Sequence, residues 1–265
     1  HSGSERSISQ NSCLQKLLKR NMRIAIISDI HANFPALEQT LKSIEEQNID
    51  AVYCLGDLAG YNLCPNAVIN EIRKKHIPTL AGNHDVKAVE IHNDGSNDIE
   101  SYAYQIVGKE QIKYLSALPA HIKLEYQTAN KLIKILMVHG SPYSSREYLL
   151  EDKNEKDFTN IFLDSNTDIL ICGHSHLPYH RILENPNKKG SYFHAINAGS
   201  VGKPKDRNPD CCYAVISIEK SSNLSKKDGI KVEFIRVPYD IEKAARAIEE
   251  SPLPDVYAFM LRKAY

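Results

Sequence analysis

The sequence predicts an α/β protein built around a parallel sheet. Short apolar runs rich in β-branched residues alternate with segments of helical periodicity, which is the strand–helix order of parallel sheets. Most of these runs end in aspartate, asparagine or histidine, so polar side chains collect where strands stop. At 265 residues and 29.9 kDa the chain is long enough to bury a large core.

The first predicted strand covers 24–28 and ends in Asp29-Ile-His31. A helix follows from Phe34 to about Glu46, with apolar residues at helical spacing. Ligands of open α/β sheets bind beyond the carboxyl ends of the strands. Asp29 and His31 therefore offer an oxygen and a nitrogen to one cation; alternatively, Asp29 caps the helix and His31 is an ordinary loop residue.

Two further strands complete a βαβαβ pattern. Residues 51–55 form the second and end in Gly56-Asp57, after which Pro65 opens a helix at its first position. A short strand over 77–80 ends in the sequence Gly82-Asn83-His84-Asp85.

Residues 86 to about 120 interrupt this alternation. They contain a turn-rich linker at 93–98 and helical patterns, which together predict a helical insertion beside the strand ends. Strands at 122–126 and 132–138 follow, and the second of them ends in His139-Gly. A loop and a helix are expected between 143 and 160.

The last part of the chain predicts more strands and two closing helices. Residues 168–172 form a buried strand that ends in Gly-His174-Ser-His176. Four alternating segments predict antiparallel strands, at 178–184, 191–196, 212–218 and 231–237. Helices are expected at 240–249 and 254–261, within a C-terminal helical region of about 240–263, and Asp240 suits the N-cap of the first.

Composition and charge exclude several classes of protein. Lys+Arg and Asp+Glu are both 33, so no overall field attracts nucleic acid or an anionic membrane, although a local basic groove stays open. No apolar run approaches the roughly 18 residues of a membrane span. The six cysteines form no C-x-x-C motif and read as core thiols of a reducing compartment, which predicts a cytoplasmic protein.

Residues 1–21 are expected to be a polar N-terminal tail without a signal-peptide core. Its first residues, His-Ser-Gly-Ser, look like an expression remnant, and Met22 is a plausible natural start. One domain is expected over 22–265.

The ordered set D-x-H, G-D, G-N-H-D, H-G and G-H-x-H resembles the calcineurin-like metallophosphoesterase superfamily. The segments Asp29-Ile-His31-Ala-Asn33 and Asn197-Ala-Gly-Ser200 are similar to its small bacterial and archaeal phosphodiesterase branch. The resemblance covers Met22 to about Val237. It implies a four-layer α/β sandwich in which two mixed sheets lie face to face with helices outside.

The resemblance also implies two divalent metal ions that share one ligand. Asp29, His31, Asp57 and His176 would hold the first ion. Asp57, Asn83, His139 and His174 would hold the second, so that Asp57 bridges the two. Mixed nitrogen and oxygen ligands suit Mn, Fe, Zn or Co, with Mn favoured here. A hydroxide between the ions would attack the phosphorus of a phosphodiester.

His84 is predicted to be the general acid that protonates the leaving oxygen, with a pKa near neutrality, and Asp85 to orient its ring. The alternatives are a third nitrogen ligand for His84 and a helix cap for Asp85. Three residues are expected to contact substrate, namely Asn33, Arg146 and Lys205. Each has an ordinary structural or solvent-exposed alternative. Tyr102 and Tyr104 either stack on a base or belong to a helical core.

The favoured function is therefore a dinuclear-metal phosphodiesterase acting on a small, nucleotide-like phosphoester. Protein Ser/Thr phosphatases follow this Gly-Asp with two variable residues and then Asp-Arg-Gly. Here Gly56-Asp57 is followed by Leu58-Ala59-Gly60-Tyr61, so the Asp-Arg-Gly is missing. A non-catalytic scaffold for protein partners is the second hypothesis, although scaffolds of this kind tend to lose a ligand. The third is a nuclease, which would want a basic, aromatic groove. The insertion and the C-terminal helices are expected either to close the site or to form a homo-oligomer contact.

Overall fold

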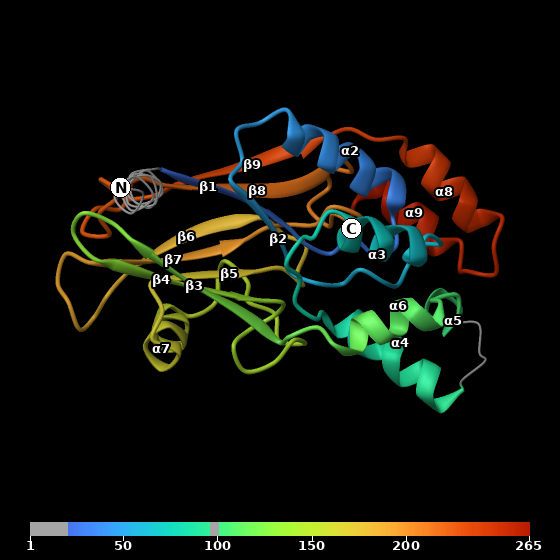
Figure 1. Cartoon of the computed structure of the whole chain (residues 1–265), viewed down its shortest axis with the longest axis horizontal. Coiled ribbons are helices and arrows are strands. Elements are labelled where there is room, and N and C mark those ends of the chain that lie inside the picture. Colours follow the sequence, from blue (N-terminus) through green and yellow to red (C-terminus); the bar gives the residue numbers. More distant parts are fainter. Residues whose placement is uncertain (1–20, 96–100) are drawn as a thin grey trace, which may run out of the picture.

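The computed structural model describes residues 21–95 and 101–265 and has two β-sheets stacked face to face (Figure 1). The first sheet has the strand order β2-β1-β8-β9. Its strands are β1 (Met22–Ile27), β2 (Ala51–Cys54), β8 (Cys211–Ile218) and β9 (Lys231–Val237). β1 pairs parallel with β2 and antiparallel with β8, so the sheet is mixed.

The second sheet has the order β3-β4-β5-β7-β6. Its strands are β3 (His121–Gln127), β4 (Leu132–Val138), β5 (Ile169–Cys172), β6 (Tyr179–Glu184) and β7 (Tyr192–Asn197). β4, β5 and β7 run parallel to one another, while β3 and β6 pair antiparallel at the two edges.

Helices cover the outer face of each sheet. The first sheet packs on α2 (Phe34–Glu45) and α3 (Pro65–Lys74), and the second on α7 (Glu155–Ser165). At one end of the sandwich lie α4 (Asn83–Asp94), α5 (Tyr102–Gln105) and α6 (Lys109–Ser116), together with α8 (Ile241–Glu249) and α9 (Val256–Lys263) (Figure 1). None of the helices in the described part of the chain is long and apolar enough to cross a membrane.

The apolar run of β1 follows from its place between two buried layers. Ile24 and Ile26 point into the core between the sheets, while Ala25 and Ile27 point toward α2 and α3. All four side chains are no more than 1% exposed, and burying each large one stabilises the fold by about 1.5–3 kcal/mol. The four-layer α/β sandwich is thus confirmed.

Two predicted segments differ in the structure. Residues 77–80 do not form a strand; Thr79 makes a single bridge to Cys54, because the neighbouring Pro78 has no N–H to extend a ladder. The helical region begins at Asn83 rather than residue 86, so α4 carries part of the site. Of the predicted linker at 93–98, the first two residues belong to α4, and 96–98 lie outside the described residues.

The antiparallel strands predicted near 178–184, 191–196, 212–218 and 231–237 are present, with the difference that β7 also pairs parallel with β5. Asp240 is the N-cap of α8, as predicted, and its side chain accepts a hydrogen bond from the Lys243 amide. The predicted N-terminal tail lies almost wholly outside the described residues.

Candidate metal centre

Four strand ends and the first turn of α4 meet at one edge of the sandwich. β1 and β2 belong to the first sheet and β4 and β5 to the second, so the site spans both sheets. Backbone hydrogen bonds join the loops that leave these strands: the His31 amide donates to the Asp57 carbonyl (2.8 Å), and the Gly173 amide to the His139 carbonyl (2.8 Å). The structure therefore brings together all seven predicted ligand residues, which are Asp29, His31, Asp57, Asn83, His139, His174 and His176.

The backbone at this edge is strained. Asp29, His31, Asp57, His174 and His176 have φ angles between 49° and 62°, in the left-handed region. Such a conformation costs a non-glycine residue about 1–2 kcal/mol, and strain of this kind concentrates at functional sites. Five of the seven predicted ligands have this conformation.

Each carboxylate at the centre has one oxygen bound by protein and one without a partner. Asp29 Oδ2 accepts from the Ser28 hydroxyl (2.6 Å) and the His174 amide (3.0 Å). Asp57 Oδ1 accepts from the His84 amide (2.8 Å). Asp29 Oδ1 and Asp57 Oδ2 are buried and accept no hydrogen bond within the described chain. Unsatisfied buried carboxylate oxygens are costly, and a bound cation would satisfy both.

The histidines resemble the carboxylates in having one side-chain atom bound by protein and one left as a possible ligand. Four of them direct one ring nitrogen at a backbone carbonyl: His31 at Ala59 (3.0 Å), His139 at Leu55 (2.8 Å), His174 at Arg146 (3.1 Å) and His176 at Lys203. Such a bond fixes the tautomer and leaves the other nitrogen as a neutral ligand, which is the usual arrangement around protein-bound metals.

The free atoms lie at the spacing of ligands around cations. His176 Nε2 is 3.0 Å from Asp29 Oδ1 and 3.2 Å from His31 Nε2. On the other side, His139 Nε2 is 3.2 Å from Asp57 Oδ2 and 3.0 Å from Asn83 Oδ1. Two ligand atoms each about 2.1 Å from one ion are about 3.0–3.4 Å apart at octahedral or tetrahedral angles. The residues therefore fit two cations, with Asp57 between them.

The electrostatics of the centre also favour bound cations. Burial opposes the charge on Asp29, yet His176 and His139 hold its pKa well below the usual range. Burial likewise opposes a charge on His139, but the carboxylates of Asp57 and Asp29 raise its pKa to about 10. Without a cation, the positive charge of protonated His139 compensates the negative charge of these buried carboxylates. A divalent ion carries more positive charge and compensates them better.

His84 lies beside the ligands and has a partner that the sequence did not reveal. Its Nδ1 is 2.6 Å from the hydroxyl of Tyr104, so Nε2 is the free ring nitrogen. One ring nitrogen lies within 4.8 Å of the ligand atoms of His31 and Asp57. Burial lowers the pKa of His84 to about 3, which corrects the expected value near neutrality. The ring is therefore neutral at pH 7.

The predicted contact between Asp85 and the His84 ring is wrong. The hydrogen bonds of the Asp85 carboxylate come from the backbone amides of Asp57 (2.8 Å), Leu58 (2.8 Å), Ala59 (3.3 Å) and Gly82 (2.9 Å). Asp85 thereby fixes the loop that bears Asp57 and, as the third residue of α4, binds the amide of Gly82, so Gly82 and not Asp85 is the N-cap of the helix.

The three expected substrate contacts have different outcomes. Asn33 is 1% exposed, donates to the Gly202 carbonyl (2.9 Å) and to Tyr239, and caps α2, so its amide is not free for substrate. The Arg146 guanidinium is exposed and lies 4.0 Å from Glu90 on α4. The Lys205 ammonium interacts electrostatically with Asp29 and Asp57, and burial lowers its pKa. Phosphate contacts by Arg146 and Lys205 stay predictions.

Tyrosines line the centre in a way that the sequence analysis missed. The Tyr61 ring packs against His31 and His84, each with ring centroids 4.8 Å apart, and Lys203 lies over it at 4.7 Å. Tyr148 stacks on His174 at 4.3 Å. Tyr104 is 5% exposed, so it belongs to the core rather than to a base-stacking surface. The sequence signal for Tyr61 is its position four residues after Asp57, and the other two tyrosines have no such signal.

Comparison with known proteins decides the family. A model described as the calcineurin-like phosphoesterase superfamily domain matches residues 22–221. The chain belongs to this superfamily. An uncharacterized protein of Methanocaldococcus jannaschii is 30% identical over 251 residues, which cover 88% of this chain and 94% of that one.

Two solved structures share the architecture. A metallophosphoesterase from Sphaerobacter thermophilus is 25% identical in sequence to this protein, with a TM-score of 0.70. The match covers 93% of this protein and 100% of the Sphaerobacter chain. A hypothetical protein from Pyrococcus horikoshii has a TM-score of 0.75 at 22% identity, covering 92% and 99% respectively, and so supports the fold alone. Membership in a phosphoesterase family and the paired free ligands agree in indicating a metal-dependent hydrolase.

Proposed function

We propose that the protein hydrolyses phosphodiesters with two divalent metal ions. The observation that carries this proposal is the pair of buried oxygens, Asp29 Oδ1 and Asp57 Oδ2, that accept no hydrogen bond from the described residues and face histidine nitrogens. Asp29, His31 and His176 would hold one ion and Asn83, His139 and His174 the other, with Asp57 shared. Ions at this place would supply Lewis acidity toward water and phosphate oxygens.

Mn, Fe, Zn and Co all suit this mixture of imidazole, carboxylate and amide ligands, and Mn is our first choice for reconstitution. The described cysteines are free, and four of these five thiols are buried, which supports the proposal of a reducing, cytoplasmic setting.

His84 would act on the substrate directly. Burial raises the pKa of Tyr104, so its hydroxyl keeps its proton and, in the His84 tautomer with Nδ1 unprotonated, donates to Nδ1. The proton of the neutral His84 ring is then on Nε2, where it would donate a hydrogen bond to a phosphate or leaving oxygen. An anionic substrate favours the protonated ring by Coulomb attraction, and in that form His84 would give up a proton as the general acid.

The test is hydrolysis of bis-p-nitrophenyl phosphate together with metal content. Wild-type protein is expected to bind about two ions per chain, as the dinuclear arrangement requires, and to cleave the diester. We expect His84→Ala to keep its metal and lower kcat by about 10²–10⁴-fold, the usual contribution of an acid–base group. His92→Ala, at an exposed histidine further along α4, serves as the control and should change neither.

Two results would count against the proposal. A protein that binds metal but cleaves no phosphoester in a broad panel would favour the scaffold hypothesis. Equal activity of His84→Ala and wild type would leave the metal centre intact but remove His84 from the mechanism.

A further inference from the structure

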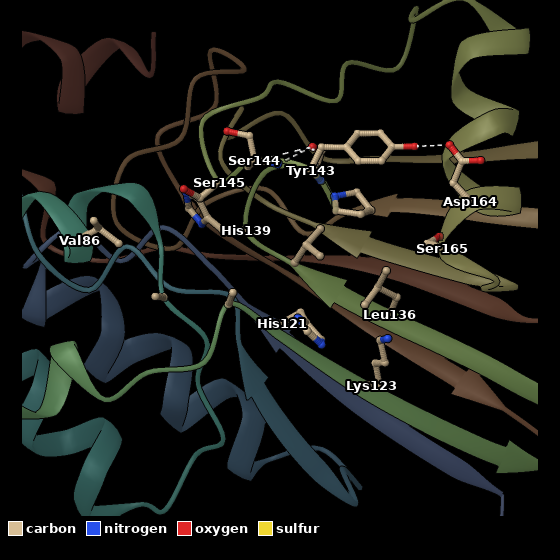
Figure 2. Close-up of a pocket in the computed structure, with 15 residues that line it drawn as sticks. Val86, His121, Lys123, Leu136, His139, Tyr143, Ser144, Ser145, Asp164 and Ser165 are labelled. Carbon is tan, nitrogen blue, oxygen red and sulfur yellow. Dashed lines mark hydrogen bonds between the residues drawn. The ribbon is translucent and has the colours of Figure 1, made fainter.

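A groove of about 460 Å³ begins beside His139 and runs along the outer face of β3 and β4 (Figure 2). This β3–β4 groove has Leu136 in its floor, Tyr143 along one wall, and His121 and Lys123 on the opposite side, and Val138 also lines it. Its volume is typical of sites for small organic ligands, which are about 300–1,000 Å³. The metal-centre mechanism makes no use of it.

The groove and the metal centre share one residue. His139 lines the groove, and its Nε2 lies 3.2 Å from the free oxygen of Asp57. His139 is also 3.0 Å from Asn83, which opens α4, and Val86 of the same helix lines the groove. The groove and the candidate metal centre are therefore adjacent, with His139 in common and Val86 in the same helix as Asn83.

Tyr143 is an aromatic wall fixed at both ends. Its amide donates to the Ser141 hydroxyl (3.1 Å), and its phenol donates to Asp164 of α7 (2.7 Å). This last bond raises the pKa of Tyr143 to about 12, so the phenol remains a donor at neutral pH. The ring is nevertheless 60% exposed. An aromatic ring already held in place loses little conformational entropy when a ligand stacks on it.

The other groups around the groove define the chemistry of the ligand. The floor is apolar, but Ser144, Ser145 and the exposed side chains of His121 and Lys123 supply donors and acceptors at the sides. An acyl chain would leave these polar groups without partners, whereas a nucleobase has a flat apolar face and polar edges.

We infer that the β3–β4 groove binds the nucleoside part of the substrate, with its base stacked on Tyr143, while the attached phosphate lies at the metal centre. This inference rests on the proposed function, because it assumes that the phosphate of the substrate binds at the metal ions. It makes Tyr143 a residue that determines specificity.

The inference is tested by calorimetric titration of the metal-loaded protein with two phosphonates that it cannot hydrolyse. One is methylphosphonate, and the other is the methylenephosphonate analogue of AMP, which adds an adenosine group to the same head group. Wild-type protein should bind the adenosine compound at least about fivefold more tightly, since base stacking on one aromatic ring contributes about 5- to 150-fold.

The Tyr143→Ala variant should weaken binding of the adenosine compound by about 5- to 100-fold and leave methylphosphonate binding within about twofold. Tyr143→Phe keeps the ring and should retain most of the affinity, which separates stacking from a general disturbance of the loop. Phe259→Ala removes another exposed ring, on α9, and should change neither affinity.

Equal affinity of wild-type protein for the two phosphonates, absence of binding of the adenosine compound, or an equal loss for both in Tyr143→Ala would overturn the inference. These outcomes are independent of turnover. If bis-p-nitrophenyl phosphate is not hydrolysed while Tyr143-dependent binding is observed, the proposed function fails and the groove site stands.

Discussion

At the scale of single residues, the position of His84 depends on the absence of a side chain at Gly60. A Cβ at Gly60 would lie 2.7 Å from His84 Nδ1 and 3.3 Å from Tyr104, the two groups joined by a hydrogen bond. Its φ of +89° is also unfavourable for other residues. The residue therefore leaves the space that the His84–Tyr104 pair occupies.

We expect Gly60→Ala to displace His84 and lower kcat toward bis-p-nitrophenyl phosphate by about 10- to 100-fold, because small misplacements of catalytic groups have large effects. Gly95→Ala is the matched control: its φ is +68°, but no atom of the described residues lies within 4 Å of the added Cβ. Both variants should lose stability, measured by thermal unfolding. A similar loss of kcat in both would show that backbone strain, and not contact with His84, is responsible.

At the scale of secondary-structure elements, the β6–β7 pair contains two histidines that the metal centre does not use, His194, which is buried, and His180, which is half-buried. His180 Nε2 and His194 Nδ1 are 2.9 Å apart, and His194 Nε2 has no partner within the described residues. Burial, with the adjacent His180, lowers the pKa of His194 to about 3. The folded protein therefore resists protonation of His194, whereas the unfolded chain accepts a proton below about pH 6.5.

This depressed pKa makes stability depend on pH. The contribution of His194 is fully present above about pH 6.5 and falls by about 1.4 kcal/mol per unit as the pH drops from there toward 3. The free energy of unfolding, measured with urea, should fall between pH 7.5 and pH 5.0. We expect this fall to be about 2 kcal/mol smaller in His194→Gln than in wild type. The exposed His92→Gln should behave like wild type. Equal losses in all three proteins would contradict the assignment.

At the scale of the whole molecule, the metal centre joins the two sheets. Asp29, His31 and Asp57 follow strands of the first sheet, and His139, His174 and His176 follow strands of the second. Ions bound only by the folded protein stabilise it by about 2.7 kcal/mol at a hundredfold excess over Kd.

Removal of metal with a chelator should therefore lower Tm by about 5–10 °C, and addition of Mn²⁺ should restore it. The Asp57→Asn variant, which lacks the shared carboxylate, should show a much smaller response to Mn²⁺. The measurement is differential scanning calorimetry with and without the ion. An unchanged Mn²⁺ response in Asp57→Asn would place the stabilising ion elsewhere in the molecule.

Local sequence determined most of the strands and the candidate ligands. The run of Ile24 to Ile27 is apolar on both faces, so a buried strand followed from its pattern alone, and the polar residues after it had to lie at a sheet edge. The ligands identified from Asp29 to His176 meet in the structure for this reason. Family resemblance supplied the two-sheet arrangement, which periodicity does not specify.

Contacts between distant segments were decided by tertiary structure alone. Tyr104 bonds to His84 and Asp85 to the loop of Asp57 because α4 to α6 pack at the end of the sandwich, and no periodic signal encodes those pairings. The same holds for Asn33, whose amide is occupied by Gly202. The β3–β4 groove forms only where two strands, α4 and the loop of Tyr143 converge. Sequence periodicity reports which face of an element is buried, whereas partners and cavities depend on how the elements pack in three dimensions.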